Sequence, residues 1–299
     1  MISSDPLDSI FNPDRLLKAI ATYRLSNFNN IHIEELENVF DFINLFNLIC
    51  LNIGGCPVFR VRQNDGENPY NKSSDLWIPP SSLTKLGRAN RKGHPVFYGS
   101  FDPITAIKEA RIKQGSYFSI ANFNLSSMNV NDLSSIIITL PKNHHLGSET
   151  QRLYSMILND FIFAEFTKPV GVGTEFNYKA SCLLAEKYFS TPHKDSIVYP
   201  SVYDYGSFNI AFQEEAATKR LMLNQVLFSR LEGWSTDGFP IISTFQEGKL
   251  ADKENLSYKD FHPDARNFEL KPDKLWKGGD SINKRLITML QKLAYTPNV

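Results

Sequence analysis

The sequence predicts an α+β fold, because helix-like and strand-like segments follow one another without a regular alternation. The first fifty residues carry apolar side chains at helical spacing. From Pro57 the pattern changes to short runs of branched and aromatic residues, separated by turn signals and by a few helical segments. The strands are too short and too irregularly ordered for a doubly wound parallel sheet. A mixed or antiparallel sheet with surrounding helices is therefore expected.

The N-terminal region is expected to hold two helices. Asn12-Pro13-Asp14 is typical of a helix start, since Asn accepts hydrogen bonds from free amides, Pro fits the first turn and Asp opposes the dipole. A second helix is expected over about 33–50, apolar around most of its circumference. The segment 52–55, Asn-Ile-Gly-Gly, ends this pattern. Residues 1–52 are therefore predicted to form a helical N-terminal extension.

The main domain is expected at 53–234. A helix is predicted to begin at the Asp102 cap, to carry Glu109 and to end near Gln114, before Gly115. The other expected elements are strands at 58–61, 94–98 and 136–140, helices at about 149–166 and 176–189, paired strands at 197–199 and 209–212, and a strand within 221–234. Residues 235–299 are expected to form a C-terminal extension packed on this domain, irregular and charged to about 275, with a closing helix at 283–293.

Composition and charge exclude several function classes. The 32 Lys and Arg residues balance the 32 Asp and Glu residues, so no overall field attracts nucleic acid or an anionic membrane. The three cysteines form no CxxC pair, and the chain begins without a signal-peptide pattern, which favours a cytoplasmic protein. His144-His145 has no third ligand in its local pattern, so no metal site is expected.

Four residues in the stretch 59–109 form a candidate site. Arg60 and Arg88 offer forked guanidinium groups that match the oxygens of a pyrophosphate. Tyr98 offers a ring that would stack on, or hydrogen-bond to, a flat heterocycle. Glu109, if aimed into a cleft, would bind ribose hydroxyls and stabilise positive charge on an oxocarbenium-like carbon.

Each candidate also has an ordinary structural explanation. A strand arginine is commonly a solvated surface residue, a tyrosine is commonly part of the core, and a helical glutamate commonly pairs with a neighbouring lysine or arginine. Ser201 follows Pro200 at the end of an expected strand, and Asn209 opens the next one. A serine after proline commonly caps a turn; contact of its hydroxyl with a ligand is the alternative. Only the order of the whole set favours one site.

Six short segments that contain these candidates, taken in chain order, resemble the RES domain, a family named for its arginine, glutamate and serine. The resemblance covers roughly residues 57–232 and includes Gly87-Arg88-Ala89-Asn90 and Tyr199-Pro200-Ser201. The six segments are 58–62, 87–90, 95–98, 105–109, 199–201 and 209–212.

The resemblance implies an NAD-consuming toxin of a bacterial toxin–antitoxin pair, with a fold like that of ADP-ribosyltransferases. It implies a catalytic set of Glu109, Arg60 and Tyr98. In this set Arg60 joins Arg88 in holding the NAD phosphates, Tyr98 lies near the nicotinamide and its ribose, and Glu109 serves the bond-breaking step. Ser201 and Asn209 are implied to line the same pocket. NAD is then the substrate, and no further cofactor is expected.

The chain departs from compact members of that family in three segments. These are the extension 1–52, an insertion at about 115–195 and the extension 235–299; in addition, Ala89 stands where tryptophan is frequent. The expected reaction is cleavage of the nicotinamide–ribose bond by hydrolysis or phosphorolysis. Transfer of ADP-ribose to a protein, and a non-catalytic interaction domain, are the alternatives. Family precedent implies an antitoxin that covers the active site, and a homo-oligomer stays open.

Overall fold

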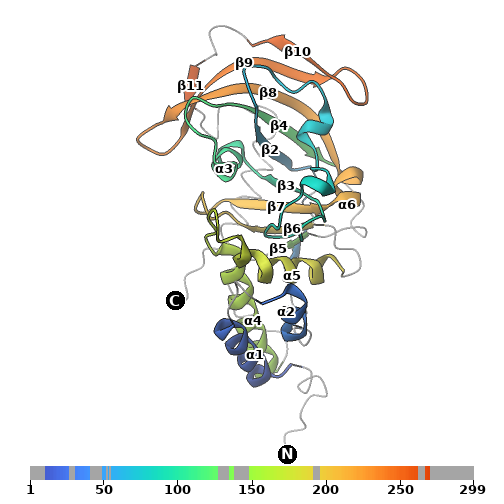
Figure 1. Ribbon diagram of the computed structural model, residues 1–299, viewed down its shortest axis with the longest axis vertical. Coiled ribbons are helices and arrows are strands. Elements are labelled where there is room, and N and C mark those ends of the chain that lie inside the picture. The colour runs from blue at the N-terminus through green and yellow to red at the C-terminus, as the bar shows by residue number, and fades with distance from the viewer. Residues whose placement is uncertain are drawn as a thin grey trace, which may run out of the picture.

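The structure is a computed structural model that describes residues 11–26, 31–40, 49–51, 53, 55–126, 135–137, 148–190, 196–261 and 267–269. Within these ranges, eleven strands form one curved sheet, and a layer of helices lies beyond its β5–β6 end (Figure 1). The strands are β1 (Ile49–Leu51), β2 (Pro57–Gln63), β3 (Val96–Ser100), β4 (Tyr117–Leu125), β5 (Ser135–Ile137), β6 (Ser196–Pro200), β7 (Phe208–Gln213), β8 (Leu221–Trp234), β9 (Pro240–Leu250), β10 (Leu256–Asp260) and β11 (Asn267–Glu269).

The strand order is β1-β5-β6-β7-β3-β2-β4-β8-β9-β10, and β11 pairs with β9. All pairs are antiparallel except β5 with β6, which is parallel. The class is therefore α+β, as the sequence predicts.

The two halves of this sheet meet at a weak join between β2 and β3. One residue pair, Phe59 with Ser100, is in register there, whereas β2 pairs with β4 along its whole length and β3 pairs with β7 in the same way. Helix α3 (Pro103–Glu109) packs on both β2 and β3 beside this join (Figure 1). The strand backbones thus separate next to the helix that carries Glu109.

Three longer helices build the helical layer. They are α1 (Pro13–Leu25), α4 (Glu149–Thr167) and α5 (Tyr178–Phe189), joined by the shorter α2 (Ile33–Phe40). Helix α1 begins as predicted, with Asn12 Oδ1 accepting a hydrogen bond from the Arg15 amide at 2.9 Å. It packs on α4, and the side chains of Tyr23, Phe161 and Tyr188 are buried in the core that links these helices to β6 and β7.

Arg91 ties this helical layer to the loop that carries Arg88. Its guanidinium donates to Glu186 of α5 at 2.7 Å and also pairs with Glu37 of α2. These carboxylates raise the pKa of Arg91. Because Arg91 directly follows Asn90, these contacts with α2 and α5 help to fix the loop at 87–90.

Several predicted elements are confirmed. Helices α1, α4 and α5 and strands β2, β3, β6, β7 and β8 lie at the expected places, with ends shifted by a few residues at most. The prediction for 41–48 and the closing helix at 283–293 lie outside the described residues, as do 138–140 of the expected strand at 136–140. None of the helices in the described ranges is long and apolar enough to cross a membrane.

Three predictions of secondary structure are wrong. Residues 49–51 form strand β1 and do not continue a helix, because a short apolar run fits either element and here it pairs with β5. Helix α3 ends at Glu109 and not near Gln114, because Arg111 adopts a left-handed φ of 51°. The segment after Trp234 is not irregular, since β9, β10 and β11 extend the sheet there. Charged side chains are common on edge strands, and β10 at the edge carries Lys259 and Asp260.

The predicted domain limits stay predictions, but two findings bear on them. Strand β4 lies within the expected insertion at 115–195, yet it stands in the middle of the sheet between β2 and β8. Strand β9 belongs to the expected C-terminal extension, and it pairs with β8 along most of that strand. Both segments therefore contribute to the same sheet as the candidate site.

Gly99 at the join offers a test of this packing. A Cβ there would lie 2.4 Å from Val58 Cγ1 and 3.1 Å from the Phe59 carbonyl oxygen, and both residues are buried. We expect Gly99→Ala to lower the free energy of unfolding by about 1–3 kcal/mol, the usual cost of overpacking a core. Urea denaturation measures it. Gly66→Ala is the control, because nothing lies within 4 Å of its Cβ position; equal midpoints for both variants would contradict the account.

Candidate active site

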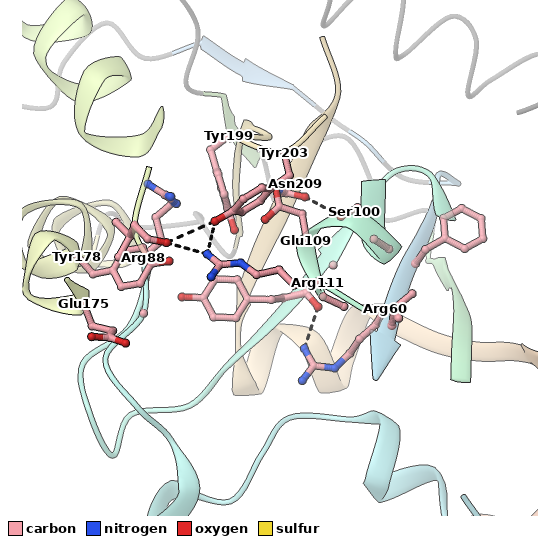
Figure 2. A pocket seen from close by; sticks show the side chains of 18 of the residues that line it. Arg60, Arg88, Ser100, Glu109, Arg111, Glu175, Tyr178, Tyr199, Tyr203 and Asn209 are labelled. Atoms are coloured by element: carbon pink, nitrogen blue, oxygen red, sulfur yellow. Dashed lines mark hydrogen bonds between the residues drawn. The ribbon is translucent and has the colours of Figure 1, made fainter. Parts of the chain in front are cut away.

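A cavity of about 530 Å³ opens beside the β2–β3 join, a size within the usual range for small-molecule sites (Figure 2). Five of the six predicted site residues line it: Arg60, Arg88, Tyr98, Glu109 and Asn209. The sixth, Ser201, contacts Glu109 directly. The structure thus brings together residues that lie up to 149 positions apart in the chain, Arg60 and Asn209 being the extremes.

Glu109 is held by one of its two carboxylate oxygens. Oε1 accepts hydrogen bonds from Ser201 Oγ at 2.6 Å and from Asn209 Nδ2 at 2.7 Å. Asn209 is itself oriented, because its Oδ1 accepts from Ser100 Oγ at 2.6 Å (Figure 2). Within the described ranges, Oε2 accepts no hydrogen bond and Glu109 forms no ion pair. One oxygen therefore fixes the carboxylate, and the other is free to bind a ligand.

Helix α3 places Glu109 through contacts at both of its ends. Asp102 caps the helix by accepting from the Thr105 amide at 2.8 Å, as predicted. Lys108 pairs with Asp204, and Thr105 Oγ1 donates to Asp204 Oδ2 at 2.6 Å. Since Asp204 lies in the β6–β7 loop, three residues after Ser201, these contacts fix Glu109 and its serine partner relative to each other.

Arg60 lies on β2 and spans the weak join. Its Nη1 donates to the Tyr98 carbonyl oxygen at 2.8 Å, and its Cζ lies 5.2 Å from the centre of the Phe97 ring. Its Nε is buried and finds no hydrogen-bond acceptor among the described residues. Burial, followed by the charge of Arg62, lowers the pKa of Arg60 to about 10, so the side chain is a cation at neutral pH. A half-buried cation with a buried, unused Nε favours an anionic ligand.

Tyr98 is fixed through its hydroxyl. The hydroxyl donates to Asn90 Oδ1 at 2.8 Å and accepts from the Ala89 amide at 2.8 Å. Burial raises the pKa of Tyr98, so the phenol stays protonated. Both hydrogen bonds of the hydroxyl are made within the protein, so the ring is the part of Tyr98 that is left to contact a ligand. Of the two contacts predicted from the sequence, stacking is the one this arrangement favours.

Arg88 is buried in the cavity wall and caps the C-terminus of α4. Its Nη1 donates to the Glu165 carbonyl at 3.2 Å and its Nη2 to the Lys168 carbonyl at 3.0 Å. Its Cζ also lies 5.2 Å from the centre of the Tyr178 ring. A cation at the last carbonyls of a helix is stabilised by the helix dipole. Much of this guanidinium is therefore engaged with the backbone.

Sequence reasoning missed several residues of the cavity. Arg111, Tyr178 and Tyr203 line it, and Ser100 orients Asn209. Tyr199 also lines it; the motif contains this tyrosine, but no role is predicted for it. Nothing local in the sequence distinguishes Arg111 from a surface helix residue, because its position depends on where α3 ends. In the part of the chain that the structure describes, no group of three His, Cys, Asp or Glu residues is arranged to hold a metal ion.

Removing the Tyr98 hydroxyl tests the fixed loop at 87–90. Tyr98→Phe leaves the Ala89 amide and the Asn90 oxygen without their buried partner, so we expect a loss of about 1–3 kcal/mol in the free energy of unfolding. Tyr258→Phe is the matched control, because its hydroxyl makes one hydrogen bond, to the Tyr70 carbonyl at 2.9 Å. A smaller loss for Tyr98→Phe than for Tyr258→Phe would show that the loop does not depend on this hydroxyl.

Comparison with known proteins identifies the family of the chain. The family model of the RES domain matches residues 57–226, a range that begins at β2 and includes every predicted site residue. No protein with a curated description matches the chain. The family match supports the ADP-ribosyltransferase-like fold and is consistent with an NAD-related, toxin-like domain. Because the matched range covers more than half of the 299 residues, the chain belongs to the RES domain family.

Proposed function

We propose that this protein cleaves the bond between nicotinamide and ribose in NAD, with water or phosphate as the acceptor. The observation that carries the proposal is the state of Glu109 in the cavity wall. Two neutral donors, Ser201 and Asn209, hold one of its oxygens, and the other oxygen has no partner among the described residues. These two hydrogen bonds fix the position of the carboxylate without pairing it with a cation.

The chemistry of this bond suits a site with one such carboxylate. Nicotinamide in NAD is already cationic, so it departs with the bonding electron pair and needs no proton from a general acid. The ribose carbon is then left with positive charge, as in the oxocarbenium-like transition state of glycoside cleavage. In this proposal Glu109 stabilises that charge and binds the ribose hydroxyls through its free oxygen.

The other predicted residues take supporting roles in the proposal. The Arg60 side chain, half-buried and with its Nε unused by the described residues, would bind a phosphate of NAD. The Tyr98 ring would pack against the nicotinamide, since its hydroxyl is fixed by the loop. Arg88 would contribute positive charge from the cavity wall. Ser201 and Asn209 would act by positioning Glu109.

In the cell, we expect this activity to make the protein a toxin. Loss of NAD would make the protein toxic in the cytoplasm of its own host, and a toxin of this kind needs restraint. We expect a cognate antitoxin that covers the cavity, because a cover there would block entry of NAD. This part rests on the family to which the chain belongs and on the open cavity.

Glu109→Gln tests the proposal. The glutamine oxygen accepts the same two hydrogen bonds but carries no charge, so we expect NAD loss to slow by about 100- to 1000-fold, the usual cost of removing a principal electrostatic stabiliser. Mass spectrometry of the purified protein with NAD, with and without phosphate, measures the rate and identifies the product as ADP-ribose or its phosphate ester.

The matched control is Glu215→Gln, an exposed glutamate on α6 (Glu214–Arg220) that pairs with Lys219. We expect it to consume NAD at the wild-type rate. Near wild-type turnover by Glu109→Gln would refute the role of the carboxylate. If a cell lysate is added to this assay and ADP-ribose is found attached to its proteins, with little free product, that result would favour ADP-ribosylation of a protein. Intact NAD with the wild-type protein would favour a non-catalytic interaction domain.

A further inference from the structure

Arg111 combines an unfavourable backbone with a place in the cavity wall. It has a φ of 51°, and among the described residues no other non-glycine residue has a positive φ. This conformation is disfavoured for a residue with a Cβ, and it persists where surrounding contacts impose it, frequently at functional sites. Arg111 follows Glu109 by two positions, and its amide donates to the Lys108 carbonyl at 3.1 Å, just past the end of α3.

The Arg111 side chain turns back towards Tyr203 (Figure 2). Its Nη2 donates to the Val170 carbonyl at 2.7 Å and contacts the Tyr203 hydroxyl, and its Cζ lies 4.7 Å from the centre of the Tyr203 ring. Within the described ranges, Nε and Nη1 have no hydrogen-bond partner and Arg111 forms no ion pair. The residue is exposed. The guanidinium is thus held by one end, with donors left for a ligand.

The three arginines of the cavity differ in what they have left to offer. Arg88 is buried, and both of its terminal nitrogens donate to carbonyls at the end of α4. Arg60 is anchored to the Tyr98 carbonyl, with a buried Nε. Arg111 is the exposed one of the three, and it stands beside Glu109 in the chain. In NAD the diphosphate is attached to the nicotinamide ribose. If that ribose lies at Glu109, the diphosphate therefore lies close by, where a cation would stabilise it.

We propose that Arg111 binds the diphosphate of NAD, a role that the resemblance assigns to Arg60 and Arg88. This inference rests on the proposed function. Forked guanidinium groups bind phosphate oxygens through paired, charge-assisted hydrogen bonds, and Nε and Nη1 supply donors for them. The contacts with Val170 and Tyr203 hold the guanidinium in place before NAD arrives, which lowers the entropic cost of binding.

The test separates binding from catalysis. For Arg111→Ala we expect the KM for NAD, and the Kd for ADP-ribose measured by calorimetry, to rise by about 10- to 100-fold, while kcat stays within about threefold. Arg111→Lys keeps the charge without the fork and should recover part of the affinity. Arg230→Ala is the matched control, because Arg230 also lies over a tyrosine ring, that of Tyr117, but away from the cavity; both constants should stay within about twofold of wild type.

The outcomes are distinguishable. If the wild-type protein neither consumes NAD nor binds ADP-ribose, the proposed function fails and this inference fails with it. If the wild type is active and Arg111→Ala keeps both constants, the inference alone is overturned. A change only in the KM for added phosphate would assign Arg111 to the acceptor and would also overturn it.

Tyr203→Phe keeps the proposal testable even if Arg111→Ala does not fold. This variant removes the hydroxyl that contacts Arg111 and keeps the ring and the arginine. A diphosphate contact predicts an unchanged or lower Kd for ADP-ribose, since Nη2 gains a free N–H. If Arg111 serves only to hold the β6–β7 loop, Tyr203→Phe should weaken binding and lower the melting temperature, and that result would overturn the proposal.

Discussion

The site depends on a sheet that is almost interrupted between β2 and β3. A single residue pair, Phe59 with Ser100, joins the two halves in register, although each strand is fully paired on its other side. Gly99 allows the close approach at this point, and Arg60 adds a side-chain hydrogen bond to the Tyr98 carbonyl across it. The cavity lies beside this incomplete join, and residues of both halves line it.

The charges of the cavity follow from what each charged group contacts. The chain is neutral as a whole, so attraction of an anion depends on local groups. Glu109 is held by neutral donors and forms no ion pair within the described ranges, whereas Lys108 nearby pairs with Asp204. Arg88 is engaged by the α4 carbonyls. The cavity therefore offers arginines for the anionic part of a ligand and, at a different place, the Glu109 carboxylate for a carbon that becomes positive during reaction.

The sequence predicts the identity of the site residues better than their use. Periodicity and turn signals locate β6, β7 and β8, and an ordered set of motif residues identifies the cavity. Periodicity fails for β9, whose pattern is broken by polar residues and glycine, and for the end of α3, which depends on the backbone of a single arginine. The sequence also does not predict that Arg88 caps the C-terminus of α4, because the carbonyls that accept its hydrogen bonds lie 77 and 80 residues away in the chain. Such contacts are set by packing between distant segments and leave no local pattern.

We propose that a carboxylate fixed at one oxygen enables this protein to consume NAD. The most direct measurement is the NAD content of cells after induction of the wild-type protein and of Glu109→Gln at matched protein levels. The account predicts that NAD falls with the wild type and is maintained with the variant, which retains both hydrogen bonds to Ser201 and Asn209. An equal fall of NAD with both proteins, or no fall with either, would contradict it.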